Sequence, residues 1–238
     1  MPDKRRHRGP HPQDAALFAA DQLAKLRHAV RDYSWLLSRG YPDRGALKLV
    51  GDRYRLRKRQ RLAVSRGSCS RQAAERRRRK LLAPAALAGA AVAVDGFNLL
   101  ITIESALSGG FLFEGVDSCY RDLASIHGSY KRVAETGAAI QLAGHCLAAL
   151  SVERVHWLLD KPVSNSGKLR QLLYEAAEKA GWNWTVTLHY NPDRLLIESK
   201  QPVLTSDSLI LDQCAGWFNG ARHVVEAKIQ QAKVIQIG

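Results

Sequence analysis

The chain has 238 residues, 46% of them hydrophobic, a composition that allows one large domain or two small ones and excludes disorder throughout. Its net charge of +14 is concentrated in residues 1–82, which hold 23 lysines and arginines against 7 aspartates and glutamates. Residues 83–238 hold the other 13 of the chain's 36 lysines and arginines and the other 15 of its 22 aspartates and glutamates. This asymmetry predicts a nucleic-acid-binding module beside a catalytic or structural domain; the alternative is a basic, solvated helical surface without a fixed partner.

Cysteine spacing and hydropathy indicate a cytoplasmic protein. No C-x-x-C pair occurs, so we expect buried thiols in a reducing compartment at Cys69, Cys119, Cys146 and Cys214. The apolar stretch over residues 81–94 is shorter than the roughly 20 residues of a membrane span and contains Pro84. The charged first 12 residues lack the apolar core of a secretory signal. We therefore expect no membrane segment.

The basic first third has the pattern of a small all-helical domain over residues 14–82, after a charged tail over residues 1–13. Apolar residues at steps of three and four predict a first amphipathic helix, with Leu23, Leu26, Val30, Tyr33 and Leu37 on its inner face. A second short helix is expected from Asp43, a candidate N-cap. Residues 55–66 and 70–82 predict two further helices, both strongly basic.

These basic helices are compatible with a helix-turn-helix-like nucleic-acid binder, although many small helical bundles share the pattern. The side chains that we expect to contact nucleic acid are Arg57, Lys58, Arg59, Arg61, Arg76, Arg77, Arg78 and Arg79.

The remaining residues, 83–238, alternate strand and helix patterns. Strands are predicted over residues 90–94, 152–159, 184–190 and 203–205, with a last one within residues 224–237. Helices are predicted over residues 99–107, 118–126, 140–150, 169–180 and 209–218. This alternation is typical of an α/β domain with a mostly parallel sheet flanked by helices.

Four aspartates close or directly follow the predicted strands: Asp95, Asp160, Asp193 and Asp207. Because the carboxyl ends of neighbouring parallel strands meet at one edge of a sheet, these side chains are expected to converge. Clustered carboxylates repel one another, and a hard cation such as Mg²⁺ or Mn²⁺ relieves that repulsion while activating a water for attack on phosphate. The sequence therefore favours metal-dependent phosphodiester cleavage.

Each aspartate also has a structural interpretation. Asp95 with Gly96 would form a turn at a strand end, and Asp160 could do the same before Pro162. Asp193 and Asp207 would cap the helices that follow them, a role that is compatible with metal ligation.

Three segments make the resemblance to a known family specific. They are Val94-Asp95-Gly96-Phe97-Asn98, Asn191-Pro192-Asp193-Arg194 and Val203-Leu204-Thr205-Ser206-Asp207-Ser208. They are similar to the first and later motifs of PIN-like nucleases, especially the NYN branch. The resemblance covers roughly residues 90–220 and none of the first domain. The whole chain also resembles uncharacterised prokaryotic proteins that join a basic helical region to such a domain.

The resemblance implies a PIN-like, Rossmann-like fold and a nuclease that uses Mg²⁺ or Mn²⁺. Catalytic metal ligands would be Asp95, Asp193 and Asp207, with Asp160 and Asp212 as further ligands. The side chains that would hold these carboxylates in place are Asn98, Ser206 and Ser208. PIN-like domains often pair, so a homodimer is an expectation as well.

Two other motifs are weaker. Residues 162–168 do not match a Walker A loop, because Pro162 replaces glycine and Leu169 replaces the Mg²⁺-binding serine or threonine. Lys168 could still contact a substrate phosphate, and so could Arg194. A haloacid dehalogenase-type phosphatase needs a second carboxylate two residues after Asp95, where this chain has Phe97.

We therefore expect a metal-dependent nuclease that acts on RNA rather than DNA. The alternative is a catalytically inactive PIN-like protein with a nucleic-acid-binding or regulatory role. This alternative stays open because no Asp-Asp or Asp-x-Asp pair accompanies the later motifs.

Overall fold

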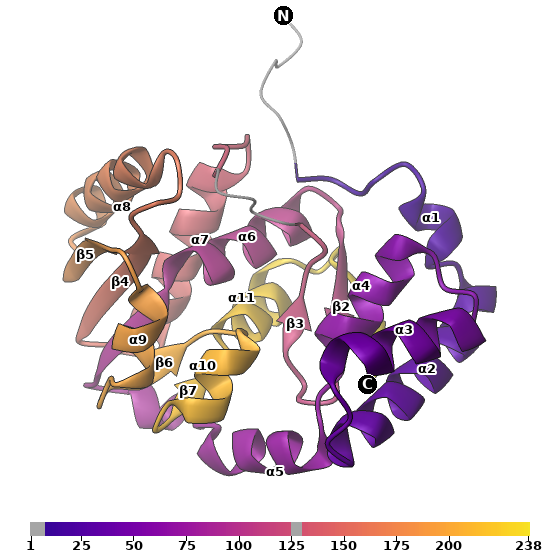
Figure 1. The fold of residues 1–238 in the computed structure, drawn as a ribbon. Helices are drawn as coiled ribbons and strands as arrows, with labels where there is room; N and C mark the ends of the chain where they lie inside the picture. The colour runs from indigo at the N-terminus through magenta and orange to yellow at the C-terminus, as the bar shows by residue number, and fades with distance from the viewer. Residues whose placement is uncertain (1–7, 125–129) are drawn as a thin grey trace, which may run out of the picture.

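The structure is a computed structural model that describes residues 8–124 and 130–238 (Figure 1). Its N-terminal part is helical, with α1 Asp14–Leu17, α2 Ala20–Ser38, α3 Asp43–Arg53, α4 Lys58–Gly67 and α5 Arg71–Lys80. The four predicted helices of this region are thus confirmed as α2 to α5. The N-cap expected at Asp43 is wrong, because Pro42 occupies that position and makes no side-chain cap bond. The hydroxyl of Ser70 caps α5 by accepting a hydrogen bond from the Ala73 backbone N–H.

The main sheet has five strands, all parallel, in the order β5-β4-β1-β6-β7. Its members are β1 Ala91–Asp95, β4 Arg154–Asp160, β5 Trp184–His189, β6 Val203–Leu204 and β7 Trp217–Phe218. The predicted α/β class, with a mostly parallel sheet flanked by helices after a helical N-terminal region, is confirmed.

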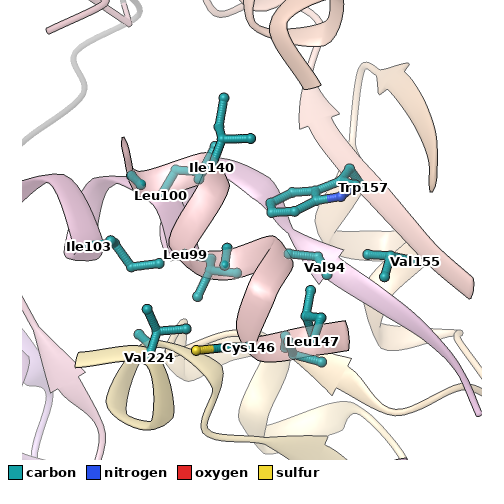
Figure 2. Close-up of a cluster of buried hydrophobic side chains, with 14 of the residues drawn as sticks. Val94, Leu99, Leu100, Ile103, Ile140, Cys146, Leu147, Val155, Trp157 and Val224 are labelled. Carbon is teal, nitrogen blue, oxygen red and sulfur yellow. The ribbon is translucent and has the colours of Figure 1, made fainter. Parts of the chain in front are cut away.

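Both faces of this sheet are covered by helices. Val94 and Trp157 point into a core formed with α6 Gly96–Leu107, α7 Thr136–Ala149, α8 Ser166–Ala180 and α11 Gly220–Lys228 (Figure 2). On the opposite face, Ala93 packs with α9 Pro192–Ile197 and α10 Ser208–Gln213. A short 3₁₀ turn over Pro84–Leu87 leads into the sheet. Side chains that alternate along β1 thereby enter two different cores.

A second, smaller sheet has the order β3-β2-β8 and comprises β2 Phe111–Glu114, β3 Tyr120–Arg121 and β8 Lys233–Gln236. The helix predicted over residues 118–126 is wrong, because β2 and β3 form an antiparallel hairpin there, and residues 125–129 lie outside the described residues. Residues 217–218 form β7 rather than the end of a helix. The last predicted segment divides into α11 and the short strand β8.

The helical region shares its core with this second sheet. Phe18 and Leu26 pack with Phe113, Ile235 and Ile237, and the rings of Phe18 and Phe113 lie 4.7 Å apart between centroids. The hairpin and the C-terminal strand therefore complete the core of the helical region.

Helix α5 is attached to the main sheet as well, because the Trp217 indole N–H donates a 2.8 Å hydrogen bond to the carbonyl of Arg77. This bond places the basic helix α5 beside α10 and the parallel sheet, at the lower edge of Figure 1.

The expectation of buried thiols is confirmed, since all four cysteines are buried and free. Within the described residues, no helix combines the length and the apolar character that a bilayer crossing requires.

Candidate functional site

The candidate site lies where the order of the parallel strands reverses. From β1 the chain builds β4 and β5 on one side and then returns to build β6 and β7 on the other. Asp95 ends β1, and Asp207 follows β6, which is the neighbour of β1. Open parallel sheets bind ligands beyond the carboxyl ends of the strands at such a switch point. The topology therefore places both aspartates where a ligand is expected.

Hydrogen bonds hold the loops after β1 and β6 together. The Thr205 hydroxyl donates to Asp95 Oδ2 over 2.8 Å and accepts from the Asp207 backbone N–H over 3.0 Å. Asn98 Oδ1 accepts from the Ser206 backbone N–H at 2.8 Å and from the Ser206 hydroxyl at 2.9 Å. The bonds between Asn98 and Ser206 thus join the two loops. The side chain that bonds to the Asp95 carboxylate is that of Thr205. The sequence pattern alone does not indicate this role of Thr205.

The four aspartates share one electrostatic environment. Burial, and then the negative charges of Asp207 and Asp193, raise the pKa of Asp95 to about 7, although the bond from Thr205 acts in the opposite direction. Burial and Asp207 raise the pKa of Asp193, and burial and Asp193 raise the pKa of Asp160. In the described chain none of these aspartates forms an ion pair with lysine or arginine. The site therefore holds negative charge that no lysine or arginine of the described chain pairs with.

The fit to a metal ion is partial. In residues 8–124 and 130–238, no three His, Cys, Asp or Glu side chains are gathered closely enough to hold an ion by themselves. The carboxylates are near enough to perturb one another without forming a closed cage. Mg²⁺ commonly keeps several waters and takes one or two protein carboxylates, so an all-oxygen set of this kind suits a hard, partly hydrated cation.

Helix capping uses only one of the two later aspartates. Asp207 caps α10, because its Oδ1 accepts from the backbone N–H groups of Leu209 at 2.8 Å and Ile210 at 3.2 Å. Asn191, rather than Asp193, caps α9 by accepting from the Arg194 backbone N–H. The Asp193 carboxylate is therefore not committed to capping.

The carboxylate of Asp212 is engaged by Arg77, an arrangement that speaks against its expected role as a metal ligand. Its two oxygens accept from Arg77 Nε at 2.9 Å and Nη2 at 2.8 Å. Ser208 has an exposed side chain and contributes only its backbone carbonyl, which accepts from Arg77 Nη2 at 3.1 Å. Both residues therefore serve to hold α5 rather than to support the carboxylates.

The expected nucleic-acid contact at Arg77 is wrong as well, since the whole residue is only 2% exposed. Arg77 Nη1 bonds to Asp117 Oδ2 at 2.6 Å, and Arg121 Nη2 bonds to the same oxygen at 2.6 Å. Burial acts against ionisation, but the two guanidinium groups hold the pKa of Asp117 well below its usual range. Sequence reasoning did not find this network, because Arg77 is 40 residues from Asp117 and 135 residues from Asp212.

The other basic residues divide into two sets. Arg59 bonds to Asp14 at 2.8 Å and Arg61 to Asp52 at 2.7 Å, so both are engaged within the fold. Arg194 is exposed and pairs along α9 with Glu198 at 2.8 Å. The remaining predicted nucleic-acid contacts are exposed: Arg57, Lys58, Arg76, Arg78, Arg79 and Lys168.

A cavity of about 650 Å³ connects the helical region with the aspartate edge. Asn98 and Asp207 line one side, and Ser70 and Arg76 of the α5 segment line the other. An exposed arginine of the basic helix thus faces the same space as one of the candidate metal ligands.

A family model described as a domain of unknown function, DUF5616, matches residues 84–223, which contain the whole parallel sheet and the four aspartates. The chain belongs to the DUF5616 family. A second model, described as a protein of unknown function, DUF434, matches residues 25–80 of this DUF5616 protein. The protein is also similar to an uncharacterised protein of Methanocaldococcus jannaschii, with 32% identity over 186 residues that cover 78% of this chain and 88% of the relative. No solved structure matches this DUF5616 protein.

Proposed function

We propose that this protein is a PIN-like, metal-dependent nuclease that cleaves RNA. The observation that carries the proposal is the position of Asp95 at the end of β1 and of Asp207 in the loop after the neighbouring strand β6, with Asp193 close enough to raise the pKa of Asp95. Half-buried, mutually repelling carboxylates that pair with no described lysine or arginine are costly unless they serve a function, and cation binding is the function that removes the cost.

In this proposal the cation and its bound waters lie among Asp95, Asp193 and Asp207. Asp160 adds negative charge beside Asp193. A bound Mg²⁺ or Mn²⁺ would activate a water and neutralise charge that develops on the phosphate. Thr205 positions the Asp95 carboxylate, and the Asn98–Ser206 bonds keep the β1 and β6 loops at a fixed separation. Exposed arginines of α5, beginning with Arg76, would contact the phosphate backbone beside the site.

A second candidate is a PIN-like protein that has a nucleic-acid-binding or regulatory role and does not cleave nucleic acid. It is favoured by one observation, that no three candidate ligands of the described chain are gathered into a closed metal site. Both candidates require the basic surface, and only the first requires metal affinity.

The test is cleavage of a panel of labelled RNAs and DNAs with Mn²⁺ by the parent protein and by the Asp95→Asn, Asp207→Asn double variant. The matched control is Asp21→Asn, which makes the same chemical change at an exposed position of α2. We expect cutting by the parent and the control, and loss of cutting in the double variant. Circular dichroism of each variant checks the fold.

Titration calorimetry with Mn²⁺ distinguishes the two candidates. Nuclease function requires heat of binding in the parent and its loss in the double variant. Binding of RNA without metal affinity and without cutting would instead establish the non-catalytic candidate.

A further inference from the structure

The solvent-facing side of α2 contains a regular stripe of arginine and tryptophan. Arg27, Arg31, Trp35 and Arg39 follow one another at steps of four, and residues at this spacing occupy one face of a helix. All four are exposed, with Trp35 at 54%. The tryptophans at positions 157, 184 and 217 are buried, so Trp35 is exceptional in this chain.

The indole of Trp35 is already oriented. The guanidinium carbon of Arg39 lies 4.1 Å from the centre of the Trp35 ring, a close cation–π contact. An exposed aromatic ring held in this way loses little conformational freedom when a planar group stacks on it.

Trp35 lines a groove of about 930 Å³ between α2 and α5. Ser38 and Gln72 also line it, and the Ser38 carbonyl accepts a hydrogen bond from Gln72 Nε2 at 3.0 Å, which joins the end of α2 to α5. The lining includes the buried apolar residues Val30 and Trp217. Four arginines line its walls: Arg31, Arg39, Arg71 and Arg78.

The acidic side chains that line this groove are already paired. Glu75 accepts from Arg71 at 3.0 Å, and Asp117 is enclosed by Arg77 and Arg121. The groove therefore presents net positive charge around an exposed aromatic ring. A protein partner would need a matching acidic surface, whereas a polynucleotide offers both phosphates and planar bases.

We propose that the α2–α5 groove binds single-stranded nucleic acid, with a base stacked on Trp35 and phosphates on Arg31 and Arg78. Stacking on a side chain needs a base that is not paired within a duplex, and this requirement selects single strands. The inference rests on the proposed function and deepens it, because it names the class of substrate.

Helix α5 joins this groove to the aspartate site. Arg71 and Arg78 face the groove, whereas Ala73 and Arg76 face the cavity that contains Asp207, and Cys69 lines both spaces. A strand that is held by Trp35 can therefore cross α5 and enter the cavity at the switch point.

The experiment measures binding of a fluorescently labelled RNA of about 12 nucleotides, single-stranded or annealed to its complement, in EDTA so that no cleavage occurs. The variants are Trp35→Leu, Trp35→Phe, Arg31→Gln and Arg78→Gln. Leu49→Ala removes an exposed apolar side chain of α3, and Arg154→Gln removes an exposed charge at the opposite edge of the sheet, so these two serve as matched controls.

We expect Trp35→Leu to weaken single-strand binding about 10-fold with an unchanged salt dependence, and Trp35→Phe to retain most of the affinity. Each arginine variant should flatten the salt slope by roughly 0.7, as expected for one phosphate contact, and the controls should bind like the parent. Equal binding by Trp35→Leu and the parent, or equal affinity for the duplex, would overturn the proposal.

The two proposals fail separately. Loss of binding in the groove variants without any Mn²⁺-dependent cutting by the parent would retain the groove and reject the nuclease. Cutting that is unaffected by Trp35→Leu and by both arginine variants would retain the nuclease and reject the groove.

Discussion

Arg77 of the basic helix α5 and Asp117 of the β2–β3 hairpin form an ion pair of 2.6 Å in the protein interior, with side chains 3% and 1% exposed. Arg121 bonds to the same carboxylate, and Asp212 accepts from the other side of Arg77. The pair therefore connects the helical region to the α/β region through one buried network of charges.

The first prediction is that Arg77→Gln lowers the free energy of unfolding by about 3–5 kcal/mol, because it removes a buried charge that bonds to Asp212 and shares Asp117 with Arg121. Arg76→Gln removes the neighbouring exposed arginine and should change the free energy of unfolding by no more than about 0.5 kcal/mol. Urea denaturation followed by circular dichroism measures both. Similar values for the two variants would show that the buried network does not stabilise the fold.

The second prediction concerns acid. Because the pKa of Asp117 is lowered in the folded state, its charge contributes stability that is present above the ordinary aspartate pKa of about 3.9 and is lost as the pH falls below it. The parent should lose stability steeply below about pH 4. Asp117→Asn should be less stable at neutral pH and lose less on acidification. Parallel curves of stability against pH for parent and variant would contradict this role.

The third prediction has the opposite sign. The pKa of Asp95 is raised to about 7, so the protonated carboxyl stabilises the metal-free fold at low pH, and this contribution is lost as the pH rises from about 4 to 7. Asp95→Asn stays neutral. In EDTA at about pH 8 we expect it to be more stable than the parent by roughly 1–3 kcal/mol, and this advantage should disappear near pH 4.

Thermal denaturation at several pH values measures the difference between Asp95→Asn and the parent. The control is Asp21→Asn, whose exposed carboxylate lies outside the cluster. If the difference in stability between Asp95→Asn and the parent were constant across the pH range, the pKa of Asp95 would not be raised in the folded protein.

The sequence predicted the parallel sheet well because its longer strands are short, largely apolar runs, two of which, β1 and β4, end in an aspartate. β1, β4 and β5 end at residues 95, 160 and 189, within one residue of the expected positions. That Asp95, Asp193 and Asp207 lie near enough to interact electrostatically followed from topology alone. The role of Thr205 did not, because a threonine after a strand has many uses and only the register of β1 with β6 brings it to Asp95.

The errors have a common physical cause in contacts between distant parts of the chain. Trp217 was expected in a helix, but its indole bonds to the carbonyl of Arg77, 140 residues away, and fixes a two-residue strand. The arginine run was read as one exposed surface, whereas Arg77 is turned inward by carboxylates 40 and 135 residues later. Local patterns do not contain such pairings.

The fourth prediction concerns Thr205, whose hydroxyl bonds to both Asp95 and the backbone of Asp207. Thr205→Val has nearly the same volume but cannot donate to the carboxylate. Because groups that orient metal ligands typically contribute 10–100-fold to affinity, we expect Mn²⁺ binding to weaken by about that factor. Thr185→Val, at an exposed position of β5, should bind Mn²⁺ like the parent. Equal affinity in Thr205→Val and the parent would show that the hydrogen bond between the β1 and β6 loops does not position the ligand.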